Sequence, residues 1–326
     1  MTGTLNRRRK AVRPENACTM DSKASQTVYA VSSMSALESM AGKVDELPLL
    51  PQSLVSLMRL SPDEDDYFDR FEDLAREDPA LAVKIVSYAN SAASSPASPI
   101  LSIQAALARM GIQPVRALVA SLAVQRAFMP VEPSQINLWK HSVTVGVASQ
   151  RIAMLLDKLE VDPGFAYLAG LLHDVGRFVM FEHASDELLR VDETDWNTGD
   201  DLLAADMDVF MFTHSELGYL ACQRWGLPDD ISNVVRFHHG DLEQPIAPGS
   251  IDATNLCVQV ADRLDLNIFS KEKLRDATCD DYVAILSEQC SACETIAAYI
   301  DPNVLSMHIP TIRAEADELL AGLGFS

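Results

Sequence analysis

Histidine and aspartate residues recur along the second half of the chain in an order that could build a metal site. Imidazole and carboxylate groups are the ligands that divalent ions such as Fe, Mn, Zn and Ni accept in proteins. The pattern therefore predicts a site for one or two such transition-metal ions, without naming the metal. Five of the seven histidines and two aspartates belong to the set: His141, His173, Asp174, His214, His238, His239 and Asp262.

The order of these residues divides them between two predicted ion positions. His141, His173 and Asp174 would hold a first ion, which Asp262 closes from a later helix. The carboxylate of Asp174 can also bridge to a second ion, held by the other three histidines. Two ions about 4 Å apart can clamp a phosphoryl group and activate a water molecule for attack.

Each part of the set also has an ordinary structural explanation. A His-Asp pair such as His173-Asp174 arises by chance, and a single buried histidine often only completes a core. The dipole at the C-terminal end of a helix could equally favour the pair His238-His239. The order and chemistry of the full set favour the metal site. Two histidines fit no such pattern and are interpreted as ordinary surface or helix-end residues: His183 and His308.

The elements that must position these side chains are predicted to be helices throughout. Hydrophobic residues make up 48% of the 326 residues and aromatic residues only 6%. A chain rich in Ala and Leu and poor in Gly favours helices. Apolar residues recur with helical spacing around His141 and over residues 166–181, 232–237 and 256–264. No alternating pattern is long enough to predict a sheet, so the predicted fold class is all-α.

Composition divides the chain into a disordered tail and three helical parts. The tail is polar and lacks apolar periodicity, and it contains Met20, an alternative start to Met1. Pro130 and Pro133 mark the boundary between the first two helical parts. The predicted parts are the tail (1–35), an N-terminal helical subdomain (36–130), a second helical subdomain that carries the histidine–aspartate set (131–270) and a C-terminal helical extension (271–326).

Charge and cysteine content restrict the classes of partner. The formal net charge of −21 repels a phosphate backbone, so no direct binding to nucleic acid is expected. Acidic stretches at residues 63–78 and 186–208 are interpreted as solvated surface, or as a docking surface for a basic partner. The Cys290 and Cys293 pair is expected on the buried side of an amphipathic helix. No apolar run reaches the length of about 20 residues that a membrane span needs, and no signal peptide is visible, so a cytoplasmic location is expected.

Several longer segments resemble known families. The segment LLHDVG at residues 171–176 resembles the HD superfamily of metal-dependent phosphohydrolases. LPLLPQSL, EDPALAVKIVSYANSA and PILSIQAALARMGIQPVRALV, in the first half, resemble the HDOD domain. HSELGYLACQRWGLPDDISNVVRFHHG and VADRL continue that resemblance, which covers about residues 44–270.

The resemblance implies a two-part helical HDOD fold with an HD-type subdomain in its second part. HDOD proteins are similar there to HD-GYP cyclic-dinucleotide phosphodiesterases, but they are mostly regarded as regulatory modules, and many have lost metal ligands. This chain departs from that tendency, because all seven ligand-type positions are present. It also departs from the HD-GYP pattern: GDLEQPIAP follows the His238-His239 pair in place of a GYP motif, and Arg177 stands where the HD-GYP consensus has Lys.

The expected function is therefore a regulatory role in signal transduction through contacts with unknown signalling proteins. An HD-type metal site would serve structure or nucleotide sensing in such a protein. The alternative is a metal-dependent phosphohydrolase that acts on a nucleotide or a phosphodiester. In that case Asp174 would bridge the metals, and Arg177 would balance the charge of the phosphate.

Overall fold

The structure is a computed structural model in which every regular element among the described residues is a helix. No strand occurs within these residues, which confirms the predicted all-α fold class. The structure describes residues 22–44, 79–90, 99–130, 132–194, 198–242 and 244–325, together with a few isolated residues between these ranges.

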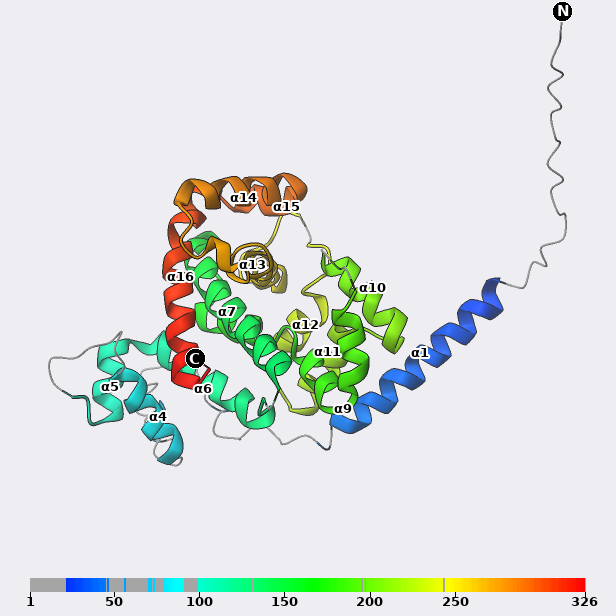
Figure 1. Cartoon of the computed structure of the whole chain (residues 1–326), viewed down its shortest axis with the longest axis horizontal. Helices are drawn as coiled ribbons and strands as arrows, with labels where there is room; N and C mark the ends of the chain where they lie inside the picture. Colours follow the sequence, from blue (N-terminus) through cyan, green and yellow to red (C-terminus); the bar gives the residue numbers. More distant parts are fainter. Residues whose placement is uncertain are drawn as a thin grey trace, which may run out of the picture.

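Helix α1 (Ser22–Val44) precedes the rest of the fold and projects from the side formed by α9 (Val175–Asp192) and α11 (His214–Arg224) (Figure 1). Ala41 and Val44 are buried, and the Ser33 hydroxyl donates to the Met211 carbonyl at 2.5 Å. Residues 22–35, which composition assigned to a disordered tail over residues 1–35, thus belong to α1, and the second half of this helix packs on the fold. Residues 1–21 lie outside the described residues.

Three helices of the N-terminal part lie together at one end of the molecule (Figure 1). Ser102 begins the second of them by accepting a hydrogen bond from the Ala105 N–H at 3.1 Å. Gly111, with φ of 78°, ends that helix and allows the next to start at once. The resembling segment at residues 47–54 lies outside the described residues. The three helices are α4 (Pro79–Ala89), α5 (Ile103–Met110) and α6 (Ile112–Ala127).

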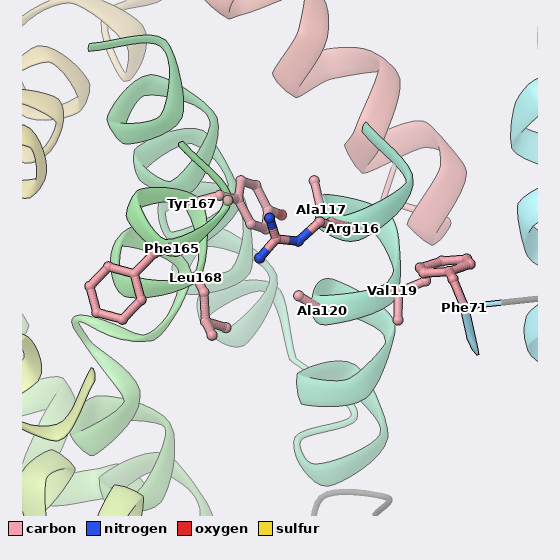
Figure 2. Close-up of a pocket in the computed structure, with 9 residues that line it drawn as sticks. Phe71, Arg116, Ala117, Val119, Ala120, Phe165, Tyr167 and Leu168 are labelled. Atoms are coloured by element: carbon pink, nitrogen blue, oxygen red, sulfur yellow. The ribbon is translucent and has the colours of Figure 1, made fainter. Parts of the chain in front are cut away.

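Helix α6 connects the N-terminal part to α8 (Pro163–Leu172) (Figure 2). The hydroxyls of Ser121 and Tyr167 share a hydrogen bond of 2.5 Å across this junction. The side chain of Arg116 reaches from α6 towards α8, where a guanidinium nitrogen lies 3.5 Å from the Asp162 carboxylate. A cavity of about 40 Å³ remains there, which is room for a few water molecules at most.

The second part is built around α7 (Pro133–Leu155), which is buried along most of its length. Helices α8 and α13 pack on α7. A Cβ at Gly170 would lie 2.9 Å from the Gly146 Cα, so paired glycines let α7 and α8 cross closely. The remaining helices of this part are α9 (Val175–Asp192), α10 (Gly199–Phe210), α11 (His214–Arg224), α12 (Asp229–Phe237) and α13 (Ile251–Leu264).

The C-terminal helix α16 (Pro302–Leu323) runs beside α7 and reaches α6 (Figure 1). Arg151 on α7 forms an ion pair with Glu315, and the Gln125 amide on α6 donates to the Leu323 carbonyl at 3.2 Å. The extension thus packs on both earlier parts of the chain. It also contains α14 (Cys279–Ala292) and α15 (Glu294–Tyr299).

The predicted single helix around Cys290 and Cys293 is interrupted. Helix α14 ends at Ala292, and the half-buried Cys293 precedes α15. The side chain of Cys290 lies outside the described residues, and Cys293 is a free thiol.

No single helix among the described residues has both the length and the apolar composition to cross a membrane. The consecutive helices α5 and α6 meet that test of length and composition only jointly, as a pair bent by 118°.

Candidate metal centre

The predicted histidine–aspartate set converges on one region of the second part. Its members come from the middle of one helix, from the ends of several others and from the turns between them. All seven residues are therefore brought together. Their positions are His141 on α7, His173 and Asp174 between α8 and α9, His214 at the start of α11, His238 and His239 after α12, and Asp262 on α13.

One group of four side chains gathers around the Nε2 atom of His214. This nitrogen lies 3.2 Å from Oδ1 of Asp174, 3.3 Å from Nε2 of His238 and 3.2 Å from Nε2 of His239. Ligand atoms of all four residues lie within 4.8 Å of one another. Three imidazole nitrogens and a carboxylate oxygen at such separations are a donor set suited to one divalent ion.

A second group consists of His141, His173 and Asp262, whose ligand atoms also lie within 4.8 Å of one another. The Nε2 atoms of the two histidines are 3.1 Å apart, and Oδ1 of Asp262 lies 3.5 Å from Nε2 of His141. Asp174 stands between the groups: its Oδ2 is 3.6 Å from Nε2 of His141, while Oδ1 faces the other group. A carboxylate in this position can bridge two ions.

The His173-Asp174 pair forms a turn, although the sequence predicted one continuous helix over residues 166–181. Helix α8 ends at Leu172 and α9 begins at Val175. Neighbours on a continuous helix point about 100° apart, and the turn lets both side chains face the same point. Asp174 is the N-cap residue of α9, yet its side chain makes no capping hydrogen bond, because the carboxylate faces the histidines.

Gly176 explains why this turn can approach His214 closely. A Cβ at Gly176 would lie 1.9 Å from the His214 backbone carbonyl oxygen and 2.8 Å from the Gly218 nitrogen. Only glycine therefore allows α9 to cross α11 at this separation. The glycine of the LLHDVG segment positions the ligands and is itself no ligand.

Backbone carbonyls orient two of the imidazoles. Nδ1 of His173 lies 2.7 Å from the Gly170 carbonyl oxygen, and Nδ1 of His238 lies 2.7 Å from the Val235 carbonyl oxygen. A carbonyl only accepts, so Nδ1 must donate and Nε2 keeps its lone pair. This tautomer directs the free electron pair of each ring towards the other ligands.

Two carboxylates that sequence reasoning missed orient two further imidazoles. Oδ2 of Asp265 lies 2.8 Å from Nδ1 of His141, and Oδ2 of Asp206 lies 2.5 Å from Nδ1 of His214. The Asp206 carboxylate also accepts the backbone N–H of His214 at 2.9 Å. Carboxylates behind metal-binding histidines raise the basicity of the ligand nitrogen. The only sequence signal was the spacing of Asp265, which follows Asp262 by three helical residues.

The interpretation of residues 186–208 as solvated acidic surface is wrong at Asp206. Its side chain is fully buried, and Asp192 from the same stretch forms an ion pair with the buried Arg177. Asp201 caps α10 together with Thr198. Part of the stretch therefore supports the centre from inside the fold, and charge density alone could not separate these aspartates from their exposed neighbours.

Burial favours the neutral, ligand form of three imidazoles. It lowers the pKa of His173 to about 4 and lowers the pKa of both His238 and His239. Burial also raises the pKa of Asp262. At neutral pH these three imidazoles are therefore uncharged, and the Nδ1 hydrogen bonds of His173 and His238 leave the Nε2 lone pairs of those two rings available to a metal.

The other two imidazoles carry protons that a metal ion would replace. Burial alone would lower the pKa of His141, but the hydrogen bond to Asp265 and the nearby carboxylates raise it to about 9. Burial alone would likewise lower the pKa of His214, but the carboxylates of Asp174 and Asp206 raise it to about 9. Despite its burial, Asp174 has a pKa well below its usual range because His173 and His214 lie beside it.

The chemistry of the residues present fits the binding of divalent metal. Oδ1 of Asp174 is buried and accepts no hydrogen bond, although it lies amid the ring nitrogens. An acceptor-only carboxylate oxygen left unpaired in the interior is costly, and coordination to a cation would satisfy it. Four imidazoles whose Nε2 atoms converge while their Nδ1 atoms are held by other groups have the same explanation.

A cavity of about 480 Å³ opens beside the centre. His141, His173, Asp174, His239 and Asp262 all line it, so a ligand in the cavity would reach both groups. Arg177, the other predicted site residue, also lines the cavity and is 6% exposed. Its guanidinium pairs with Asp192, lies 3.8 Å from Asp174 and has an Nη1 atom with no hydrogen-bond partner. His183 and His308 belong to neither ligand group.

Solved structures of other proteins have the same helical fold. An HDOD domain protein of unknown function from Geobacter sulfurreducens is 25% identical, with a TM-score of 0.67 over 89% of this chain and 99% of that chain. A candidate phosphohydrolase from Shewanella amazonensis SB2B is 20% identical, with a TM-score of 0.62 over 88% and 98%. A candidate signal transduction protein from Marinobacter aquaeolei VT8 is 20% identical, with a TM-score of 0.66 over 90% and 66%.

The match to a family model agrees with the resemblance seen in the sequence. The HDOD domain model matches residues 47–240, which is more than half of the chain. The chain spans less than half the length of the curated relatives that it matches. On the extent of the domain match, this chain belongs to the HDOD family.

Proposed function

We propose that this protein is a regulator in signal transduction whose metal centre controls contacts with partner proteins. One observation carries the proposal: the helices that provide metal ligands also hold the N-terminal part. Helix α8 leads into His173 and Asp174 and packs on α6, while α7 carries His141 and packs on α16. A change at the centre would therefore act directly on helices that reach the rest of the fold.

Hydrogen bonds between these helices support this coupling. Ser121 on α6 shares a hydrogen bond with Tyr167 on α8, two turns before the ligands. Helix α16 joins the same network, because the Lys84 ammonium on α4 donates to the Gly322 carbonyl at 3.3 Å. The absence of a GYP motif after His238-His239 and the name of the M. aquaeolei relative favour regulation over cyclic-dinucleotide hydrolysis. Unknown signalling proteins remain the proposed partners.

Hydrogen exchange with and without metal tests the coupling. Chelator-treated protein and protein reloaded with Mn²⁺ or Zn²⁺ would be compared helix by helix, with Asp174→Ala as the matched control. Metal should slow exchange in α7 and α8 and also in α6 and the second half of α16, because all belong to one packed unit. Slowing confined to the ligand turns would contradict the proposal.

A second candidate function is metal-dependent phosphoester hydrolysis, and the large cavity beside a complete ligand set favours it. Divalent ions at such a centre would supply Lewis-acid activation of a phosphate ester and of water. Arg177 would hold the phosphate charge from the cavity side, and Asp174 would hold both ions. Asp206 and Asp265 would keep the imidazoles of His214 and His141 in place.

Elemental analysis combined with a turnover assay separates the two candidates. One to two equivalents of transition metal are expected in anaerobically purified protein, and none in Asp174→Ala. Turnover of phosphodiesters or nucleotides that disappears in folded Asp174→Ala would establish hydrolysis and overturn the purely regulatory proposal. Metal without turnover would support regulation. Protein without metal would contradict both functions.

A further inference from the structure

Part of the lining of the 480 Å³ cavity is apolar. Four side chains form it, and together they are called the apolar wall: Phe181 and Leu189 on α9, Trp196 in the link after it and Leu202 on α10. Leu189 is 38% exposed, and the Trp196 side chain is only partly buried. Apolar surface that faces water in a concave site costs free energy, which a bound apolar group would recover.

Another part of the cavity lining, which includes Arg177, is suited to an anion once metal is present. Arg177 is only 6% exposed, and its Nη1 atom has no hydrogen-bond partner. A buried guanidinium with a free donor suits a phosphate oxygen. Asp174 and His141, from the metal centre, line the cavity beside it. An organic phosphate in this cavity would thus meet both charged groups and the apolar wall.

The neighbouring groove does not offer the same environment. A groove of about 800 Å³ on the other side of His141 shares Asp265 and Ser270 with the cavity. Two further carboxylates line it, those of Glu272 and Asp317, and Asp317 pairs with Arg275 at 2.6 Å. Two of its cations are engaged: Arg275 pairs with that carboxylate, and the Arg313 guanidinium lies over the Phe269 ring. The organic group of a metal-bound phosphate is better placed against the apolar wall.

We propose that the apolar wall is a subsite for the aromatic group of an organic phosphate, whose phosphate end lies at Arg177 and the metal centre. Two aromatic members, Phe181 and Trp196, favour a flat ring, since offset or edge-on ring contacts add to simple apolar burial. The ring can belong to a nucleobase or to another aryl phosphate. The proposal rests on the proposed metal centre, because without ions the cavity holds more carboxylates than cations.

Two matched probes test the subsite: phenylphosphonate and methylphosphonate, which share the anionic end and resist hydrolysis. Their affinities for Mn²⁺-loaded protein would be measured by calorimetry. Phenylphosphonate should bind about tenfold more tightly or better, because a whole ring leaves water. Quenching of tryptophan fluorescence provides a second readout, since Trp139 and Trp225 are only 1% and 6% exposed while Trp196 lines the cavity.

Substitutions in the wall locate the effect. Trp196→Ala should reduce the preference for the phenyl group to less than about threefold, and Trp196→Phe should keep most of it. Met307→Ala, which removes an apolar side chain that is 61% exposed on α16, should leave the preference unchanged. Adenosine 5′-monophosphate in the same assay distinguishes the sources, because binding as tight as that of phenylphosphonate points to a nucleobase and weaker binding to another aryl group.

The outcomes separate this proposal from the metal centre itself. Metal-loaded protein that binds both phosphonates equally would overturn the subsite and leave the centre intact. The same holds for a preference that survives in Trp196→Ala. Protein that takes up no metal and binds neither phosphonate would overturn the centre and the subsite together.

Discussion

Two arginines, the half-buried Arg116 and the buried Arg177, stand beside two cavities of very different character. Each has an Nη1 atom that is buried and makes no hydrogen bond. Arg116 lies at the junction of α6 and α8, where Asp162 is its ion-pair partner and the cavity is about 40 Å³ (Figure 2). Arg177 lies beside a cavity of about 480 Å³ that opens on the ligand imidazoles.

The comparison shows that an unsatisfied guanidinium does not by itself mark a functional site. No histidine lines the cavity at Arg116, and apolar side chains fill most of its surroundings. At Arg177, space, converging lone pairs and an unpaired carboxylate oxygen occur together. The first arginine is therefore interpreted as part of the junction between two helices, and the second as part of a ligand site.

The largest difference between the two regions should appear in their response to pH. His141 and His214 have pKa values raised to about 9 in metal-free protein, so metal binding at pH 7 must displace both protons. Apparent metal affinity should rise on the order of 10⁴-fold from pH 7 to pH 9 and then level off, because each proton contributes about tenfold per pH unit. Chelator competition across this range measures the slope.

Metal-free stability should change in the opposite direction over the same range. The folded-state pKa of each of these histidines lies above the unfolded value of 6.5. Their contribution is therefore complete below pH 6.5 and is lost as pH rises towards 9. Denaturant unfolding of chelator-treated protein should show this decrease. A metal affinity that does not depend on pH would show that the two imidazoles bind no proton in the free centre.

The next largest difference is expected in the unfolding free energy that is lost when each guanidinium is removed. Arg177→Met leaves Asp174 and Asp192 without their cation in a buried site, and metal-free protein should lose about 3 kcal/mol of unfolding free energy. Arg116→Met should cost less than about 1 kcal/mol, because its partner Asp162 is 43% exposed. Denaturant titration of both variants in chelator measures this. Equal losses would remove the energetic distinction between the two cavities.

The sequence pointed to the residues that converge at the centre more readily than to the residues that support them. Histidines and the His173-Asp174 pair stand out because few side chains bind metal and their order is distinctive. Asp206 could not be recognised, because its role depends on the direction of one ring nitrogen of His214 and on burial within an acidic stretch. Trp196 was missed for a similar reason, since it reaches the cavity from a link between helices.

The fold shows the same division between local pattern and tertiary context. Apolar periodicity was sufficient for α7 and α13, whose faces are buried by long-range packing. It failed at α1, where polar residues gave no pattern and the contacts of Ala41 and Val44 support the helix. It also missed the break at His173-Asp174, because apolar residues continue on both sides.

A smaller effect is expected from the carboxylate that supports His214. Asp206→Ala removes the acceptor for Nδ1 and should weaken metal binding about 10–100-fold without removing a ligand. Asp162→Ala, at the other cavity, removes the carboxylate that accepts the Phe165 N–H at 2.6 Å. It should cost about 1 kcal/mol of stability and leave metal affinity unchanged. Equal metal affinity in both variants would show that Asp206 does not position the ligand.

The smallest effects should come from filling the space beside each site with one methyl group. A Cβ at Gly199 would lie 2.3 Å from Nδ1 of His239, and a Cβ at Gly164 would lie 2.3 Å from Nη1 of Arg116. The ring of His239 is confined by the other ligands, so Gly199→Ala should displace it and weaken metal binding about tenfold.

The guanidinium of Arg116 is the end of a flexible side chain and can move aside. Gly164→Ala should therefore leave metal binding unchanged and alter stability by less than about 1 kcal/mol, since alanine favours the helix that the methyl group crowds. Metal titration and denaturant unfolding of the two variants distinguish these results, and weaker metal binding in Gly164→Ala would mean that the junction of α6 and α8 is part of the centre after all.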